Sequence, residues 1–336
     1  MMTNQKRSVT IIDVAEAAGV SVSTVSRVLN NKDDVSEETF HRVEEVIADL
    51  GYSSSLAARS MRSRTTNVIG LIMPDVDDPF SIEVIRGVNQ AIVELEYDLL
   101  IYTNGDIPSN ISASREQQYV TLLNSSITDG VIIVTPVSDI FTSVSPVVSV
   151  DPNINNPSGP AVIATNLRGA VEAMEHLLEI GHRRIGYIGG RTDLLSAHLR
   201  LEGYKQVLDQ AGIPLDQNLN TSGDFKTETA MECTHQLLSL EDPPTAIFAS
   251  NDQSAIGVIL VAESLGIRIP EDLSLVGFDN IPEAAYLDLT TVDQFIRQMG
   301  YIGTQMLFDL IQGKTLDTDL HEIDTKLIVR GSTRAI

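Results

Sequence analysis

The chain has 336 residues, 43% of them hydrophobic, so it is long enough for two or three domains with sizeable cores. It contains no run of eighteen apolar residues, which argues against a transmembrane helix, and its first residues lack the apolar stretch of a signal peptide. Its single cysteine, Cys233, excludes an internal disulfide framework. From these features we expect a cytoplasmic protein.

The formal net charge of −23 is unusual for a protein that binds nucleic acid, but the charge is unevenly distributed. Residues 1–66 carry eight Lys and Arg against nine Asp and Glu, so almost all of the excess negative charge follows residue 66. An acidic surface repels polyphosphate and weakens non-specific binding, whereas local cations can still neutralise phosphates. Charge alone therefore does not indicate DNA binding, and any such inference needs a motif.

Residues 11–30 have the pattern of two short helices joined by a tight turn. Apolar residues recur at three- and four-residue steps in the first helix, which is the period of one helix face. Gly19 permits the turn, and Ser21 is a suitable N-cap for the second helix. The second helix has an apolar stripe and an opposite polar face, which a fully buried helical hairpin would not keep. The pattern therefore favours a helix-turn-helix, whose second helix enters the DNA major groove.

A third helix follows the polar loop at residues 30–34. Ser36 is a capping residue, and Gly51 marks the end of the helix. The apolar stripe of this helix consists of Phe40, Val43, Ile47 and Leu50. These residues should close a small three-helix core.

Residues 56–62 can form about two helical turns after a serine-rich linker. So short a helix is marginal in water and should order only when a partner holds it. Ala57 and Ala58 would let a second helix approach closely. The alternative is a plain interdomain linker.

From residue 67 onward, apolar runs of strand type alternate with amphipathic helices. We expect strands at 68–73, 99–102, 131–134, 147–150, 162–164, 185–188, 246–249 and 273–277. We expect helices near 79–96, 114–124, 168–180, 197–211, 227–240, 253–265 and 294–312. Continuous apolar strands separated by helices indicate parallel sheets covered on both faces. They are too numerous for one small sheet, so we predict two α/β lobes.

Polar and aromatic residues follow several of these strands. In open parallel sheets, ligands bind beyond the carboxyl ends of the strands. Carboxylate, amide and guanidinium groups can each hold two adjacent hydroxyls, and a phenyl ring can cover the apolar face of a sugar. The alternative is that Asn251, Asp252 and Asp279 simply cap helices. The candidate cleft residues are Asp75, Asp77, Phe80, Asp151, Arg200, Phe225, Asn251, Asp252, Asp279 and Asn280.

The sequence shows no pattern for a metal, a cofactor or catalysis. His176, His182 and His235 lack partners at metal-ligand spacing, and Cys233 lies in a helical apolar stripe. The glycines at residues 186–190 lack the spacing of a dinucleotide-binding loop, and no Ser/His/Asp signature is present. We therefore expect a protein that is not an enzyme and needs no cofactor.

The segment D-V-A-x-x-A-G-V-S-x-x-T-V-S-R-V-L-N, residues 13–30, resembles the DNA-binding signature of the lac repressor (LacI/GalR) family of transcription regulators. The chain's last strand, L-I-V-R-G-S-T, matches the family's usual ending. The resemblance implies an all-α helix-turn-helix head and an α/β two-lobed core like periplasmic binding proteins, with two parallel doubly wound sheets. It places the head at 1–53, a linker with a hinge helix at 54–66, and the core at 67–336. Its two lobes would comprise 67–165 with 293–324, and 166–292 with 325–336.

The resemblance also assigns DNA contacts. It gives base reading to Val22, Ser23 and Arg27, of which Arg27 can donate a bidentate pair to guanine. In the hinge, Met61 stands where the family usually has an intercalating leucine, with Arg59 and Arg62 beside it. The expected phosphate anchors are Ser21, Thr24, Ser26 and Asn30.

The family's effector contacts correspond here to Asp151, Arg200, Phe225, Asn251 and Asp279, and more loosely to Phe80. Asp75 and His198 are further candidates. No amphipathic heptad tail follows the core, so we expect a homodimer rather than a tetramer.

These features predict a ligand-responsive repressor of carbohydrate-utilisation genes that binds pseudo-palindromic operator DNA and responds to a sugar. Two alternatives stay open, namely the same regulator with a purine-type corepressor and a solute-binding protein without a regulatory role.

Overall fold

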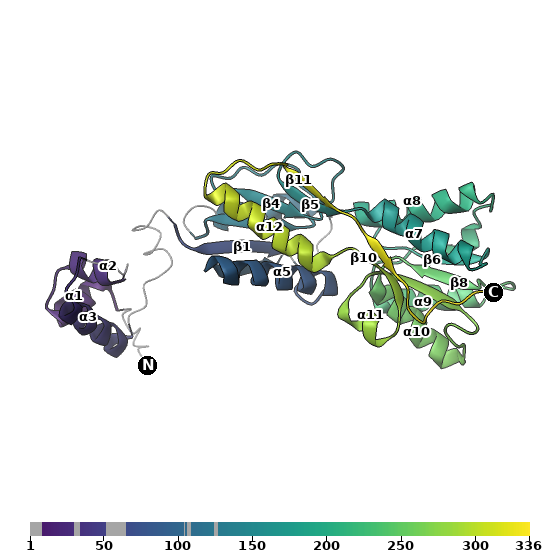
Figure 1. Cartoon of the computed structure of the whole chain (residues 1–336), viewed down its shortest axis with the longest axis horizontal. Helices are drawn as coiled ribbons and strands as arrows, with labels where there is room; N and C mark the ends of the chain where they lie inside the picture. The colour runs from purple at the N-terminus through teal and green to yellow at the C-terminus, as the bar shows by residue number, and fades with distance from the viewer. Residues whose placement is uncertain (1–8, 30–33, 52–64, 104, 106–108, 124–126) are drawn as a thin grey trace, which may run out of the picture. The chain divides into compact units, whose positions relative to one another are not determined.

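The structure, a computed structural model, describes residues 9–29, 34–51, 65–103, 105, 109–123 and 127–336 (Figure 1). The chain divides into two compact units, Met1–Thr66 and Asn67–Ile336, which we call the head and the core. Within the described ranges, no helix has the length and apolar character needed to cross a membrane.

The described residues of the head form three helices, α1 Ile11–Ala18, α2 Val22–Leu29 and α3 Glu37–Leu50, which confirms the predicted helix-turn-helix. One fully buried valine from each helix, Val14, Val25 and Val43, forms the centre of its small core. Leu50 is 37% exposed, so its expected place in the buried stripe is wrong. It lies in the last turn of α3, just before the glycine that ends the helix.

Local capping explains where the head's helices begin and end. Thr10 and Asp13 form a reciprocal capping box at the start of α1, which the sequence analysis did not identify. Ser21 accepts a hydrogen bond from the backbone N–H of Thr24 at 3.1 Å, as expected for its capping role. Gly19 adopts a φ of 66°, a left-handed conformation that glycine tolerates without steric cost.

The core's first sheet has the strand order β11-β5-β4-β3-β1-β2 and is parallel throughout. Its strands are β1 Val68–Met73, β2 Asp98–Thr103, β3 Gly130–Val134, β4 Val147–Val150, β5 Ala161–Ala164 and β11 Leu320–Ile323. Helices α5 Pro79–Leu95 and α12 Ile296–Ile311 pack on one face, whereas α6 Ser109–Leu123 packs on the other. Alternate residues of β1 face the two helical layers, which explains why this strand is apolar throughout.

The second sheet has the order β12-β10-β9-β8-β6-β7, and only the β10–β12 pair is antiparallel among its described strands. Its strands are β6 Ile185–Ile188, β7 Asn220–Thr221, β8 Ala246–Ala249, β9 Ser274–Asp279, β10 Thr290–Asp293 and β12 Lys326–Ile328. Helices α7 Asn166–Glu179 and α8 Leu195–Gln210 cover one face. Helices α9 Thr227–Leu238 and α10 Asp252–Leu265 cover the other, where Cys233 is buried as expected. The short helix α11 Pro282–Tyr286 and the 3-10 turn η1 Gln217–Leu219 lie in connections. The two predicted parallel α/β lobes are therefore confirmed.

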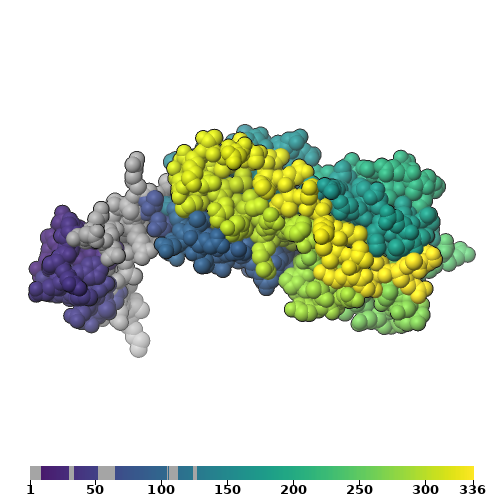
Figure 2. Space-filling view, in the orientation of Figure 1, coloured from purple at the N-terminus to yellow at the C-terminus, as the bar shows by residue number. Residues whose placement is uncertain are grey.

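The chain passes between the two sheets three times, after β5, after β10 and after β11. At two of these passages, Thr165 and Thr325 lie together, with the Thr325 backbone N–H donating to Thr165 Oγ1 at 2.8 Å. At the third, Phe295 has a φ of 53° between β10 and α12. As a result, the residues after 290, in yellow-green and yellow, cover part of both lobes (Figure 2).

Three short strands, the short helix α11 and part of helix α6 were not expected from the sequence. Strands β7, β10 and β11 are two to four residues long and polar, so they carry no apolar run. Helix α6 begins at Ser109 rather than near residue 114, in a segment rich in serine and asparagine. Tertiary pairing, rather than local pattern, determines these elements.

Glycines at the contact of α5 and α12 provide a test of this packing. A Cβ built on Gly87 would lie 1.9 Å from the backbone oxygen of Arg297, and one on Gly300 would lie 2.4 Å from that of Val84. Because these neighbours are backbone atoms, Gly87→Ala should force the helices apart and lower the free energy of unfolding by about 3 kcal/mol. Gly159→Ala, where a Cβ meets nothing within 4 Å, is the control. Equal stability of the two variants in denaturant unfolding would contradict the close helix packing.

Candidate functional site

A cavity of about 190 Å³ lies at the carboxyl ends of strands from both sheets of the core. It is in the position where open parallel sheets bind ligands. Seven of the eight predicted effector residues line it: Asp75, Phe80, Asp151, Arg200, Phe225, Asn251 and Asp279. His198, the eighth, does not line this cavity, and its Nε2 lies 2.7 Å from the carbonyl oxygen of Thr192.

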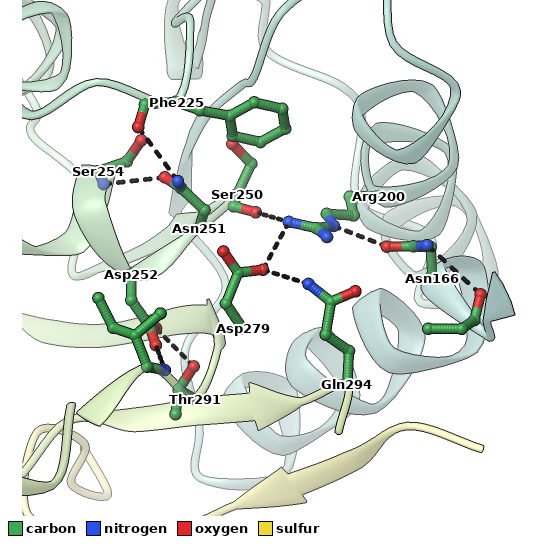
Figure 3. Close-up of polar contacts among 12 residues, drawn as sticks. Asn166, Arg200, Phe225, Ser250, Asn251, Asp252, Ser254, Asp279, Thr291 and Gln294 are labelled. Atoms are coloured by element: carbon green, nitrogen blue, oxygen red, sulfur yellow. Dashed lines mark hydrogen bonds and ion pairs between the residues drawn. The ribbon is translucent and has the colours of Figure 1, made fainter. Parts of the chain in front are cut away.

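Arg200, on α8, is the centre of the polar network in this cavity (Figure 3). It is 3% exposed, and its Nε donates to Asn166 Oδ1 at 2.9 Å. Its Nη1 donates to the backbone carbonyl of Ser250 and, at 3.2 Å, to Asp279 Oδ1. The guanidinium also lies 3.8 Å from the centroid of the Phe278 ring. These contacts hold the guanidinium in one place.

Asp279 ends β9 and links Arg200 to the passage between the sheets. Its Oδ1 accepts a hydrogen bond of 2.6 Å from Gln294 Nε2, and Gln294 directly follows β10. Burial raises the pKa of Asp279 to about 7, although the neighbouring Arg200 opposes this rise. The second amide atom of Gln294, Oε1, is buried and has no hydrogen-bond partner within the described residues.

The alternative that Asn251 and Asp252 simply cap helices explains only part of their contacts. Asn251 caps α10 by accepting from the Ser254 N–H at 2.9 Å, yet its Nδ2 also donates to the Phe225 carbonyl and the residue lines the cavity. Asp252 is fully buried and binds the Ile281 N–H and the Thr291 hydroxyl. Asp252 therefore ties β9 to β10, while Asn251 serves both as a cap and as part of the cavity wall.

The first lobe contributes residues that follow β1 and β4. Asp151 has a φ of 49°, and burial raises its pKa to about 6 against the opposing effect of Arg200. Phe80 lies in the first turn of α5, whose N-cap is Asp78. Asp75 Oδ1 accepts from the Asp77 backbone N–H at 3.1 Å, which shapes the loop after β1.

The second lobe contributes Phe225, whose φ is 72°. A Cβ on Gly190 would lie 2.1 Å from the Phe225 ring, so that glycine leaves the space the ring occupies. Gly190, after β6, thus makes room for the Phe225 ring.

Sequence reasoning missed several residues of this site. Asp78, Arg191, Asp193 and Asp224 line the cavity, and Asn166 and Gln294 hold Arg200 and Asp279. Asp78 could have been found as the N-cap before Pro79, since that pattern begins a helix at a strand end. Gln294 gave no such signal, because strand β10 itself was not expected.

The described residues hold no group of three or more His, Cys, Asp or Glu side chains that could bind a metal ion. Among the histidines, His182 is buried, with Nδ1 2.9 Å from Thr245 Oγ1.

The second candidate site is the polar face of α2 in the head. Val22 is 42% exposed, and the hydroxyl oxygens of Ser21 and Ser23 lie 2.7 Å apart. Arg27 Nε is 3.3 Å from Asp34 Oδ2 in a largely exposed ion pair. Such a pair contributes at most about 1 kcal/mol, so a phosphate or a base could replace Asp34. The predicted contacts Asn30, Arg59, Met61 and Arg62 lie outside the described residues.

Comparison with known proteins identifies the family. Residues 10–55 match the family described as bacterial regulatory proteins, lacI family, and residues 174–333 match a periplasmic binding protein-like domain. The chain is 35% identical to the HTH-type transcriptional repressor CytR of Escherichia coli (strain K12), over 99% of this chain and 98% of that protein. The chain belongs to the lacI family of bacterial regulatory proteins.

Other known regulators resemble the chain over similar lengths. It is 38% identical to the ribose operon repressor of Halalkalibacterium halodurans, over 97% of both proteins. The structure of the lac repressor dimer bound to operator and the anti-inducer ONPF matches with a TM-score of 0.84 and 26% identity, over 98% of this chain and 100% of that chain. A complex of the regulator CelR with cellobiose matches with a TM-score of 0.70 and 30% identity, over 96% and 99%.

The raised pKa of Asp279 predicts a pH dependence of stability. Between its ordinary pKa of 3.8 and its folded pKa of about 7, the folded chain binds more protons at this group than the unfolded chain does. The free energy of unfolding should therefore fall as pH rises from about 5 to 8, by on the order of 2 kcal/mol from Asp279. Denaturant unfolding measures this free energy at each pH. Asp279→Asn should show a smaller decrease than the wild-type chain, because the titrating carboxyl is absent.

Asp272→Asn is the matched control for this experiment. Its ion pair with Arg268 lowers the pKa of Asp272 to about 2, so this carboxylate is ionised in both states across the same pH range. The contribution of Asp272 to the free energy of unfolding should not change between the two pH values. If Asp279→Asn has the same pH dependence of stability as the wild-type chain, the burial of a titrating carboxyl at this site would be contradicted.

Proposed function

We propose that the chain is a ligand-responsive transcriptional repressor that binds operator DNA through α2 and a small molecule in the core cavity. The observation that carries this proposal is the combination of a helix-turn-helix head and a polar cavity lined from both lobes in one chain. Its relatives over nearly the whole length are named as repressors. A solute-binding protein would have no use for the head.

The exposed face of α2 supports sequence-specific reading of DNA. Arg27 is the only Lys or Arg on α2, and Val22 and Ser23 stand beside it on the exposed first turn. Apart from Arg27 and Arg42, the Lys, Arg, Asp and Glu side chains in the described part of the head are all acidic, so non-specific attraction to phosphates is weak there. Two such heads in a homodimer would read the two halves of a pseudo-palindromic operator.

The cavity supports a sugar as the effector. Its volume of about 190 Å³ is below the roughly 300–1,000 Å³ of pockets for drug-sized ligands, which favours a single ring. Solved relatives are described with cellobiose and with ribose. A purine-type corepressor is the second candidate, because relatives at 31–32% identity are named PurR. On this basis we propose control of carbohydrate-utilisation genes.

A ligand that contacts Arg200 and Asp279 also contacts the passage between the lobes through Gln294. Lobe closure around the ligand is the proposed signal to the head. The relatives are named as regulators, and we propose that this chain likewise binds without catalysing a reaction. A repressor acts on the chromosome, so we propose a cytoplasmic location.

DNA selection from a random duplex pool tests this function with the full chain. It should enrich a pseudo-palindrome that the chain binds in preference to scrambled competitor at fixed salt. Arg27→Ala should lose discrimination at one base pair of each half-site, by about 1–3 kcal/mol. Arg42→Ala, an exposed arginine on α3, should leave the base preference unchanged. Failure to enrich any palindrome, with or without sugars and purines, would refute the proposal.

A further inference from the structure

The charges around the core cavity are strongly unequal. Six of its lining residues are aspartates, whereas three are basic: Arg191, Arg200 and Lys226. The excess of carboxylates is a property of the wall itself and is separate from the negative charge of the outer surface. An entering ligand therefore meets mainly hydrogen-bond acceptors that carry negative charge.

The two arginines of the cavity are already engaged by protein groups. Arg191 donates to both carboxylate oxygens of Asp193, at 3.1 Å through Nε and 2.8 Å through Nη2. Arg200 is bound to Asp279 and Asn166 and lies against the Phe278 ring. A guanidinium fork of this kind is a strong phosphate ligand, and both forks here already have a carboxylate partner.

Protein side chains bind at three helix N-termini near the cavity. Asp78 caps the first turn of α5, and Asn251 caps that of α10. The first N–H of α8, at Leu195, donates to Asn153 Oδ1. Helix N-termini are the usual anion sites of α/β proteins, and at least one N–H of each already donates to a protein side chain here.

Two carboxylates line the cavity from opposite lobes. Asp151 follows β4, and Asp279 ends β9. A further anion would meet these carboxylates beside two arginines that already pair with carboxylates, so its buried charge would be poorly compensated. Hydroxyl groups, in contrast, donate to carboxylates, and Phe80 and Phe225 offer apolar surface to a ring.

We propose that the effector is an uncharged polyhydroxylated ring, a neutral monosaccharide, and that the cavity excludes its phosphorylated form. This inference rests on the proposed function, because it concerns the ligand of the same repressor. It identifies the charge state that the site accepts, and it excludes sugar phosphates and nucleotides as signals.

The test begins with a bacterial metabolite extract separated by anion-exchange resin into a neutral and an anionic fraction. Each fraction is added to the full-length chain, and the melting temperature of the core and the affinity for the selected operator are measured. The neutral fraction should change both. A response to the anionic fraction that phosphatase treatment abolishes would overturn the inference but leave the repressor function intact. A response to neither fraction would overturn both.

Purified pairs then measure the selectivity. Ribose with ribose 5-phosphate, and glucose with glucose 6-phosphate, are titrated by calorimetry. For the sugar that binds, the phosphorylated form should bind at least about 100-fold more weakly, because its charge would be buried without a partner. Equal or tighter binding of either phosphorylated form would overturn the inference.

A gain of function tests the role of the occupied arginine. Asp193→Asn removes the carboxylate that accepts from both Nε and Nη2 of Arg191. The affinity difference between the neutral and the phosphorylated sugar should therefore narrow at least about tenfold. The control is Asp272→Asn, which breaks the ion pair with Arg268, away from the cavity. This variant should leave the affinity difference between the neutral and the phosphorylated sugar unchanged. If a folded Asp193→Asn variant shows the same affinity difference as the wild-type chain, the inference that charge excludes the phosphorylated sugar would be overturned.

Discussion

The buried contact between Arg200 and Asp279 is the interaction on which the cavity depends. Removing two charges from water costs several kcal/mol per ion, and the attraction between them often does no more than offset that cost. The pair therefore contributes little to the stability of the fold, and ligand binding explains its presence better. Asn166, Ser250 and Gln294 complete its hydrogen bonds, so the charged groups are held in place before a ligand arrives.

The topology explains how one small network can influence two lobes. Asp279 belongs to the second sheet, whereas the residue after Gln294 leads into α12, which packs on the first. Phe295, at this passage, has a left-handed backbone that a bulky residue rarely adopts, so tertiary contacts impose it. A ligand held by Asp151 on one side and Asp279 on the other would bring these lobes together. Closure of this kind is a recurring way for ligand binding to produce a conformational signal.

The sequence predicted the head and the layered α/β core because local patterns determine them. Ser21, Gly19 and Gly51 act at fixed positions of their helices, and the buried strands β1 and β3 are continuously apolar. The cavity residues were partly predictable because they follow strands. The passages between the sheets were not predictable, because Thr325 and Gln294 bind partners that are distant in the sequence. Arg191 and Asp193 stand only two residues apart, but no pattern in the sequence indicates that both line the cavity.

The most direct measurement of the central claim is the thermodynamic linkage between the cavity and the head. Operator affinity of the full-length chain is measured with and without saturating effector, and effector affinity with and without operator, at one salt concentration. Because the two sites belong to one equilibrium, effector should change the operator affinity by the same factor as operator changes the effector affinity. We expect this factor to be about 5 to 150. An effector that binds in the cavity and leaves operator affinity unchanged would contradict the account.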